Sequence, residues 1–195
     1  IAEEVRRFES KRPRSRAAAA GAQTAGFHGG VPMHWMRDWP MPFPMIVAKA
    51  QGATLTDIDG NTLDDFCLGD TGAMFGHSPA PVVAAITSQA ARGMTHMLMT
   101  EDAAAVGELL RERFGLPHWQ VATTASDANR FALRVARAVT GRRQVLVMNG
   151  CYHGAVEDSY ITLCEGRAIN RPGVIGQAVD VTQTSRIVEF NDLAA

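Results

Sequence analysis

Residues 122–158 read ATTASDANRFALRVARAVTGRRQVLVMNGCYHGAVED, and this stretch decides the fold. A short turn at residues 123–126 leads into a helical pattern over about residues 127–139, and a strand pattern follows at residues 144–148, in which residues 145–148 form an unbroken apolar run. With the strand pattern at residues 119–122 before the turn, the order strand, turn, helix, strand predicts a βαβ unit. The unbroken run is typical of a parallel strand that is covered on both sides. The sequence therefore predicts an α/β fold with a mainly parallel sheet.

One face of the predicted helix carries small or branched apolar residues, which would allow close packing on a sheet: Ala128, Ala132, Val135, Ala136 and Val139. Beyond this unit, residues 166–176 have the composition of a loop, and residues 186–190 predict another strand. Asn191 or Asp192 predicts the N-cap of a further helix, of which only a few residues remain. Because so short a helix cannot bury an apolar face, we expect the natural protein to continue beyond Ala195.

Three short alternating runs upstream, residues 46–50, 53–58 and 62–66, predict a small antiparallel sheet. The turn around Gly60 lies within a group of acidic and amide residues: Asp57, Asp59, Asn61, Asp64 and Asp65. Such a group suggests calcium, but the glycine comes too early for an EF-hand and the closing glutamate is missing. We therefore predict a hairpin turn and no metal site.

Two helices are predicted between the small sheet and the βαβ unit. Ser78 would cap the first, which would end at Gly93, and Thr100 would cap the second, which would end at Gly115 before Pro117. Each has an apolar stripe that should be buried. The stripes are formed by Val82, Val83, Ile86 and Ala90 in the first helix and by Val106, Leu109, Leu110 and Phe114 in the second.

The start of the chain differs in composition from the rest. Residues 1–20 are basic and favour helix, and residues 21–32 are rich in glycine, which suits either an arm laid over a surface or a disordered tail. We predict two domains. Residues 1–75 would hold the arm, an aromatic loop and the small sheet, and residues 76–195 would form the first part of a large α/β domain.

Composition limits the classes of function. The 195 residues are 46% hydrophobic and 20% charged, as in an ordinary globular protein, and the net charge of -1 favours neither nucleic acid nor an anionic membrane as a partner. No apolar run is long enough to span a membrane, and the start lacks the apolar stretch of a signal peptide. Cys67, Cys151 and Cys164 form no C-x-x-C pair, so we expect reduced thiols. These features predict a cytoplasmic protein with a small-molecule partner.

The turn Thr124, Ala125, Ser126 lies where the predicted strand passes into the helix. Unpaired backbone N–H groups and two hydroxyls would converge there at the positive end of the helix dipole, which favours an anion such as a phosphate. Ser126 could instead serve only as the helix cap.

A second candidate segment, residues 149–154, directly follows the next parallel strand. Ligands of open α/β sheets bind beyond the carboxyl ends of the strands, so both segments should face one crevice. Tyr152 could lie flat against a planar ring, with His153 hydrogen-bonding in the same pocket. The alternative for Tyr152 is a core aromatic.

Residues 122–158 resemble the class III, fold type I pyridoxal-phosphate enzymes, whose pattern reads roughly N-S-G-T-E-A-N, a helix ending in T-G-R, a strand and G-x-Y-H-G. Residues 56–66 resemble the D-x-D-G hairpin of that family, and residues 75–79 its G-H-x-x-P helix entry. The motif GCYHG is particularly like that of glutamate-1-semialdehyde aminomutases, while the Pro-Phe-Pro stretch also resembles β-amino-acid transaminases.

The resemblance implies that pyridoxal 5'-phosphate is the cofactor. It places Ala125 and Ser126 at the phosphate, Thr124 where serine is usual, Tyr152 on the pyridine ring, and His153 in support of that pocket. Alanine replaces the family's glycine at position 125, so the turn is kept only if its backbone needs no positive φ. The only lysines are Lys11 and Lys49, so the Schiff-base lysine and the acidic partner of the pyridine nitrogen are expected beyond Ala195. No catalytic residue is assigned within this chain.

The implied activity is transfer of an amino group from an amino acid or amine to a keto or aldehyde acceptor, by a homodimer. Aminomutase or racemase activity is an alternative in the same family, and a non-catalytic phosphate-ligand-binding α/β module is an alternative from another class. Family members use the N-terminal segment to wall the substrate pocket, so Trp35, Arg37 and Trp39, with Phe43, are candidate substrate contacts. A surface loop tucked in by its aromatic residues is the other interpretation.

Overall fold

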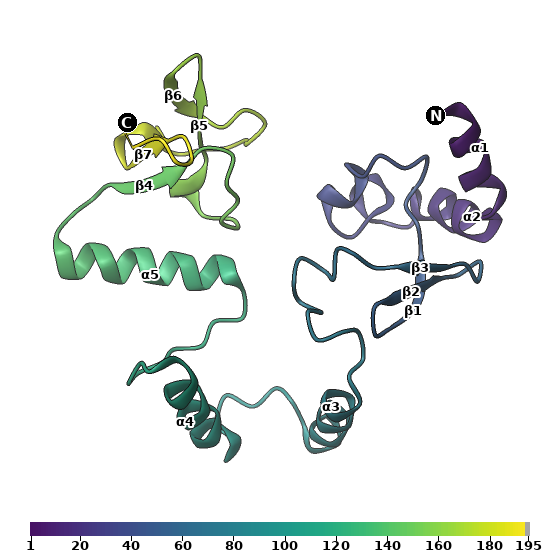
Figure 1. Cartoon of the computed structure of the whole chain (residues 1–195), viewed down its shortest axis with the longest axis horizontal. Helices are drawn as coiled ribbons and strands as arrows, with labels where there is room; N and C mark the ends of the chain where they lie inside the picture. The colour runs from purple at the N-terminus through teal and green to yellow at the C-terminus, as the bar shows by residue number, and fades with distance from the viewer. Residues whose placement is uncertain (194–195) are drawn as a thin grey trace. The chain divides into compact units, whose positions relative to one another are not determined.

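The computed structural model describes residues 1–193. Its contacts define two compact units, Ile1–Leu98 and the part from Met99 onward (Figure 1). The division after residue 75 concerns the domains of a larger protein and stays a prediction. No helix in the described part of the chain is long and apolar enough to cross a membrane.

The first unit contains the predicted antiparallel sheet. Strands β1 (Val47–Gln51), β2 (Thr54–Asp57) and β3 (Thr62–Asp64) pair in the order β1-β2-β3. Leu55 lies opposite Leu63, and the turn that joins β2 to β3 is the predicted hairpin turn.

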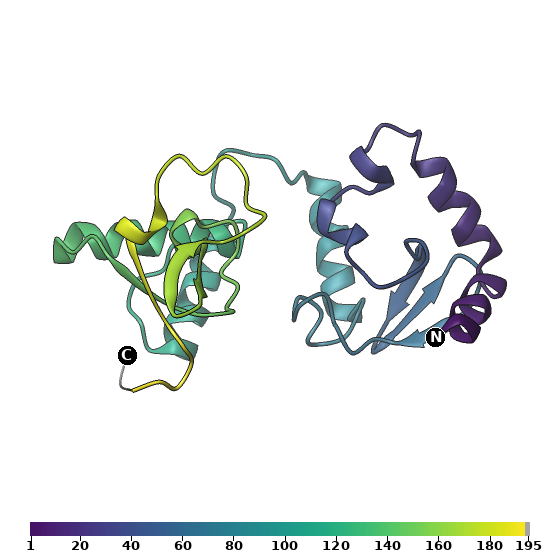
Figure 2. The same ribbon diagram turned by 90° about the horizontal axis from the view of Figure 1, so that it is seen from above.

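Two helices form the start of the chain and lie beside this sheet (Figure 2). They are α1 (Ala2–Ser10) and α2 (Pro13–Ala22), the second of which begins with proline, whose missing N–H costs nothing at a first helical position. Two 3-10 turns follow, η1 (His28–Gly30) and η2 (His34–Arg37). The residues predicted to form either an arm or a disordered tail are thus an ordered helical arm.

Helix α3 (Ala80–Arg92) ends at Gly93, as predicted. The predicted cap is wrong: Ser78 has a φ of 52°, and its Oγ donates a hydrogen bond to the carbonyl of Ala50 in the sheet instead of capping the helix. The predicted burial of the stripe is also wrong within this chain, since Val82, Val83 and Ile86 are 45–54% exposed and Ala90 is exposed as well.

In the second unit, α4 (Asp102–Phe114) ends at Gly115 in the left-handed conformation, as predicted. Its N-cap is Glu101 and has no side-chain cap hydrogen bond, so the cap predicted at Thr100 is wrong. The stripe predicted to be buried is mostly exposed here, at Val106, Leu109 and Phe114.

Helix α5 (Ala125–Thr140) and the strand that follows it, β4 (Val145–Met148), confirm the centre of the predicted unit. Strand β4 pairs in parallel with β7 (Ser185–Val188), which is the strand predicted at residues 186–190. The strand predicted at residues 119–122 is absent, because no described residue pairs with this segment. A hydrogen-bonded neighbour is what makes an extended segment a strand.

Strands β5 (Ile161–Cys164) and β6 (Arg167–Asn170) form an antiparallel hairpin that corrects the prediction of a loop from residue 166 onward. The turn between them is Glu165-Gly166, with φ values of 50° and 74°. Two central residues with positive φ match the right-handed twist of the paired strands.

The core of the second unit is formed by Val147, Ile161 and Val181, with Ile187 packed against them. Strand β4 is therefore covered on one side only, since Leu146 is 65% exposed, and the prediction of cover on both sides is wrong within this chain. The helix predicted after Asn191 falls largely on residues 194 and 195, which lie outside the described residues.

The face of α5 that lies against the rest of its unit is also not the predicted one. Its predicted stripe is exposed at Ala128, Ala132, Val135, Ala136 and Val139. The side chains of Ser126, Asn129 and Arg137 instead hydrogen-bond to segments on the sheet side. Polar contacts, rather than the small apolar residues, orient this helix.

Candidate functional site

The start of α5 is capped by Thr124. This residue is extended, its Oγ1 accepts a hydrogen bond from the Asp127 N–H at 3.1 Å, and the same hydroxyl donates to Asp127 Oδ2 at 2.9 Å. Threonine thus acts as the N-cap, so the alternative in which Ser126 only caps the helix is wrong. The Thr124 hydroxyl is engaged within the helix and is not free to donate to a ligand.

Ala125 and Ser126 occupy the first two helical positions. Their N–H groups have no acceptor among residues 1–193, as is normal at the beginning of a helix. Ala125 is not among the residues with positive φ, so its methyl group is compatible with the turn. Two backbone donors therefore remain open at the positive end of the dipole of a 16-residue helix.

Ser126 connects this helix start to the second predicted segment. Its Oγ accepts a hydrogen bond from the Ala155 N–H at 2.9 Å, which leaves the hydroxyl proton available. Asn129, one turn further along α5, donates from Nδ2 to the His153 carbonyl at 3.0 Å. The two segments predicted to face one crevice are thus hydrogen-bonded to each other.

Gly154 allows the segment of residues 149–154 to lie close to Ser126 of α5. It is buried with a φ of 79°, and a Cβ at this position would collide with the Ser126 hydroxyl and lie 3.0 Å from Ser126 Cβ. Both its conformation and its surroundings therefore require glycine.

Tyr152 lies on the loop between β4 and Gly154 and is 82% exposed. It plays no core role within this chain, so the alternative of a core aromatic is not met. The loop is held by Arg171, whose Nη2 donates to the Cys151 carbonyl at 3.0 Å. His153 is exposed and borders, together with Asn129 and Val147, a cavity of about 140 Å³ between α5 and β4.

Sequence reasoning missed the role of Asn149, which directly follows β4. Its Nδ2 donates to Glu189 Oε1 at 2.8 Å, and its Oδ1 accepts from Thr162 Oγ1 at 3.1 Å and from the Leu163 N–H at 3.2 Å. One amide thus ties the end of β4 to its neighbours and fixes where the Tyr152 loop begins. The available signal was an asparagine immediately before a glycine at a strand end.

Sequence reasoning also missed the ion pair that anchors α5. Arg137 donates from Nη2 and Nη1 to the two carboxylate oxygens of Asp158 at 2.7 and 3.0 Å, and from Nε to the Arg143 carbonyl at 2.8 Å. The hydrogen bonds from Arg137 lower the pKa of Asp158 although partial burial opposes this, and Asp158 in turn raises the pKa of Arg137. This pair holds the helix from its last turns, while Ser126 holds it at its start.

The candidate substrate residues lie in the first unit. The rings of Trp35 and Trp39 meet edge to face with centroids 6.5 Å apart, and Arg37 packs over Gly29, where a Cβ would lie within 3 Å of its side chain. Phe43 contacts Phe8 of α1 with ring centroids 5.2 Å apart. The structure therefore brings the aromatic residues together and packs their loop against the helical arm.

Three acidic residues around the β2–β3 turn contact protein groups. No group of three or more His, Cys, Asp or Glu side chains in residues 1–193 is placed to hold one. Asp57 and Asp59 face the helical arm, and Asp65 lies 2.6 Å from His77 Nε2. The hydrogen bond with His77 is the largest influence on the Asp65 carboxyl and lowers its pKa.

The fold is that of fold type I pyridoxal-phosphate-dependent aminotransferases. A glutamate-1-semialdehyde aminomutase from Pseudomonas aeruginosa PAO1 is 49% identical and superimposes with a TM-score of 0.92, over 98% of this chain and 42% of its own; this enzyme has also been solved as a variant in complex with PMP. An omega-transaminase from Sphaerobacter thermophilus is 27% identical with a TM-score of 0.78, over 92% of this chain and 42% of its own.

The family model for aminotransferase class III matches residues 36–173, so the chain belongs to this family and the predicted resemblance is confirmed. A glutamate-1-semialdehyde 2,1-aminomutase from Thermoplasma volcanium is 30% identical over 163 residues, which is 83% of this chain and 38% of the relative. The chain thus spans well under half the length of the curated relatives that it matches.

Proposed function

We propose that the protein is a pyridoxal-phosphate-dependent enzyme that transfers an amino group from an amino acid or amine to a keto or aldehyde acceptor. Membership of the aminotransferase class III family supports the class of chemistry. The observation that carries the proposal is the hydrogen-bonded half-site, in which the open start of α5 is joined through Ser126 to the loop that bears Tyr152.

The residues present fit the phosphate of this cofactor. Ala125 and Ser126 offer two backbone N–H donors, the Ser126 hydroxyl offers a third, and the helix dipole favours an anion at this point. The acidic residue in the first turn of α5 is Asp127, whose carboxylate accepts from Thr124 and pairs with Arg130 at 3.7 Å. The proposed roles of Ala125 and Ser126 therefore need no rearrangement of the helix start.

Tyr152 would stack on the pyridine ring, because its own ring is exposed on the loop that is hydrogen-bonded to Ser126 at the helix start. His153 would support this pocket from the segment that Asn129 anchors. When bound, the cofactor supplies an electron sink for the carbanion that forms at the carbon bearing the amino group. The residues of this chain hold and orient that group rather than move its protons.

The lysine that holds the cofactor aldehyde is proposed to lie beyond residue 195. Lys11 and Lys49 are the only lysines of the chain, and both belong to the first unit, whereas the half-site belongs to the second. A homodimer, a cytoplasmic location and the candidate substrate contacts Trp35, Arg37 and Trp39 are further parts of this proposal, which rest on the family resemblance and on composition.

Aminomutase activity, in which the amino group moves within one substrate, is the alternative that the names of the relatives support. The neighbour with a TM-score of 0.92 and the relative from Thermoplasma volcanium both bear the name of glutamate-1-semialdehyde aminomutase. A racemase remains an alternative in the family. A non-catalytic phosphate-binding module is supported only by the lack of a lysine in residues 99–195, the part of the sequence that contains the half-site.

The test is a titration of the full-length protein with pyridoxal phosphate, followed by the absorbance of the bound cofactor and by borohydride reduction. We expect saturable binding, covalent fixation by borohydride, and conversion of the bound cofactor to its amino form when an amino donor is added. Binding without fixation or conversion would identify the non-catalytic module. No binding would contradict both.

A matched pair of variants tests the phosphate site itself. Ser126→Ala should weaken cofactor binding by roughly tenfold or more, because it removes a hydrogen bond to a charged group. Thr123→Ala changes an exposed residue just before the cap and should leave the affinity unchanged. Equal affinities of the two variants would show that the cofactor does not contact the Ser126 hydroxyl.

A further inference from the structure

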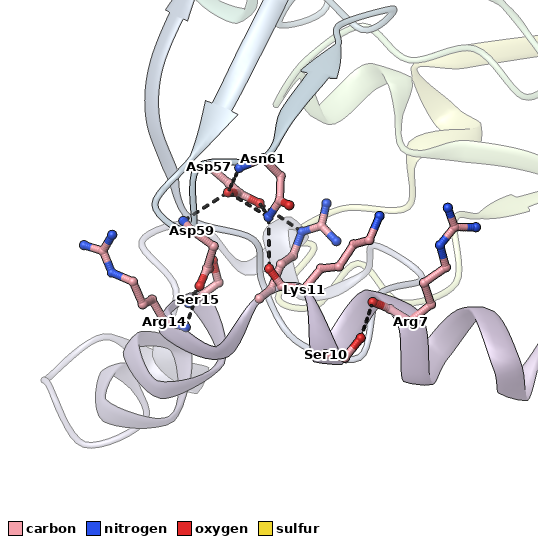
Figure 3. Close-up of polar contacts among 9 residues, drawn as sticks. Arg7, Ser10, Lys11, Arg14, Ser15, Asp57, Asp59 and Asn61 are labelled. Carbon is pink, nitrogen blue, oxygen red and sulfur yellow. Dashed lines mark hydrogen bonds and ion pairs between the residues drawn. The ribbon is translucent and has the colours of Figure 1, made fainter.

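The hairpin turn between β2 and β3 lies against the junction of α1 and α2 (Figure 3). Asp59 Oδ1 accepts a hydrogen bond from the Arg14 N–H at 2.7 Å, and its Oδ2 accepts from the N–H and the hydroxyl of Ser15 at 2.9 and 2.6 Å. Arg14 and Ser15 are the second and third residues of α2, and a helix cap normally serves these two N–H groups. The N-cap residue, Arg12, makes no side-chain cap bond. Asp59 therefore caps a helix that begins 46 positions earlier, counted from Asp59 back to Pro13.

The same turn binds the end of α1. Asn61 donates from Nδ2 to the Lys11 carbonyl at 3.0 Å and to Asp57 Oδ2 at 2.9 Å. Asp57 is 1% exposed, and its Oδ1 accepts from the N–H groups of Asp59 and Asn61 at 3.0 and 2.8 Å. The turn thus offers an acceptor to the helix that begins at this junction and a donor to the helix that ends there.

Arg12 completes the contact between the junction and the turn. Its Nε lies 3.0 Å from Asp57 Oδ2 without the alignment of a hydrogen bond, so the two form an ion pair. Its guanidinium also lies 4.3 Å above the ring of Phe8. Every carboxylate oxygen of Asp57 and Asp59 has a partner from this chain.

The C-terminal half of α2, beyond the turns that Asp59 caps, borders an apolar cavity of about 410 Å³, a size that is ordinary for small-molecule pockets. Ala19 and Ala22 of α2 form one wall, and Trp35 and Trp39 form another. No charged side chain lines this cavity. Ala19 is 6% exposed, so the wall is closely packed and the position of α2 sets the shape of the cavity.

We propose that Asp59, supported by Asp57 and Asn61, is a positioning residue: the turn caps α2 and thereby holds the wall of the cavity beneath Trp35 and Trp39. Hydrogen bonds from both ends of the junction fix the helix on the sheet, and the helix fixes the aromatic loop through the shared cavity. The link to catalysis rests on the proposed function, which places Trp35 and Trp39 at the substrate.

The test uses the full-length protein in which Trp119, and any tryptophan outside residues 1–195, is replaced by phenylalanine, so that tryptophan emission reports on Trp35 and Trp39 alone. Asp59→Ala removes the cap, and Ser15→Ala is a milder variant that removes only the hydroxyl bond. Asp64→Ala is the matched control, since Asp64 lies exposed on the same hairpin. We expect amide exchange in residues 14–22 to accelerate roughly tenfold in Asp59→Ala, less in Ser15→Ala and not in the control.

Two further readouts separate positioning from general destabilisation. Acrylamide should quench the two tryptophans more strongly in Asp59→Ala, whereas exchange in β4 should not change. In the active enzyme, the KM for the amino donor should rise about tenfold while kcat stays within about twofold. Unchanged amide exchange and unchanged quenching would contradict the proposal that Asp59 holds α2 in position. Changed exchange with an unchanged KM would overturn its role in positioning the substrate.

These outcomes are distinct from a failure of the proposed function. Exchange and quenching are measured without cofactor, and they depend only on contacts within the first unit. If the wild-type protein transfers no amino group, the proposed function fails while the exchange data still decide whether Asp59 holds α2.

Discussion

The first backbone N–H groups of helices α2 and α5 differ in whether the protein supplies them with acceptors. At α2, the first residue is Pro13, which has no N–H, and the next two N–H groups are bound by Asp59. At α5, Thr124 serves only the third N–H group, and those of Ala125 and Ser126 are left without an acceptor in the described chain. The first start is closed by the protein, and the second is open.

This difference indicates that the start of α2 has a structural role, whereas the start of α5 can bind an anion. Asp59 brings a negative charge to α2, so the dipole of that helix is already compensated. The start of α5 has only Asp127, whose carboxylate is drawn to Thr124 and Arg130. An incoming anion therefore finds two free donors at α5 and none at α2.

The largest effect on the free energy of unfolding is expected from adding a side chain at Gly154, which packs against Ser126 at the start of α5. Gly154→Ala should lower the free energy of unfolding by about 2–4 kcal/mol, because alanine is strained at positive φ and its methyl would collide with Ser126. Gly150→Ala is the control, because its φ is 76° and nothing lies within 4 Å of the place that an added methyl would take, and it should cost only about 1 kcal/mol. Urea titrations of the full-length proteins would measure both. Equal losses would show that the contact with Ser126 does not matter.

A smaller effect is expected at the other end of α5. Arg137→Met should lower the free energy of unfolding at pH 7 by about 2 kcal/mol, since it leaves the half-buried Asp158 without its bidentate partner. Arg134→Met, on the exposed side of the same helix, should have little effect.

The pH dependence of this loss has a definite sign. Because Arg137 lowers the folded-state pKa of Asp158, the pair contributes fully above the unfolded pKa of about 4 and loses its contribution as the pH falls through the lower folded-state pKa. The difference between wild type and Arg137→Met should therefore shrink in acid. A difference that stays constant down to about pH 2 would contradict this assignment.

The elements of the second unit show what periodicity can predict. Helix α5, strand β4 and strand β7 were predicted because each has a regular local pattern with a clear end. The β5–β6 hairpin was missed, because Glu165 occupies a left-handed position that usually holds glycine or asparagine. Residues 119–122 have a strand pattern, but a strand also needs a neighbour, which no pattern within the segment can supply.

For the candidate site, the sequence predicted the segments but not their contacts. Tyr152 and Ser126 were identified from their places after a strand and before a helix. The bond from Ser126 to Ala155 and the pair of Arg137 with Asp158 join residues 29 and 21 positions apart, so they depend on tertiary placement. The face of α5 was wrong for the same reason, because apolar periodicity carries no information on polar anchors.

The Thr124 cap of α5 should contribute less to the free energy of unfolding than the Gly154–Ser126 contact or the Arg137–Asp158 ion pair. Thr124→Ala should lower the free energy of unfolding by about 1 kcal/mol, because the Asp127 N–H loses its acceptor, whereas Thr124→Ser should be nearly neutral. Amide exchange of Asp127 would report the loss directly. If the serine variant lost as much as the alanine variant, the hydroxyl would not be what matters at this position.

The smallest effect on stability, with the most specific effect on function, is expected at Tyr152. Because its ring is 82% exposed, Tyr152→Ala should change the free energy of unfolding by less than about 0.5 kcal/mol. Loss of ring stacking should nevertheless weaken pyridoxal-phosphate binding by roughly tenfold, and Tyr152→Phe should retain the affinity because it keeps the ring. An unchanged affinity in the alanine variant would remove Tyr152 from the site. A large loss of stability would mean that the ring is covered in the full-length protein. The exposed binding surface at the start of α5 would then include Ser126 but not Tyr152.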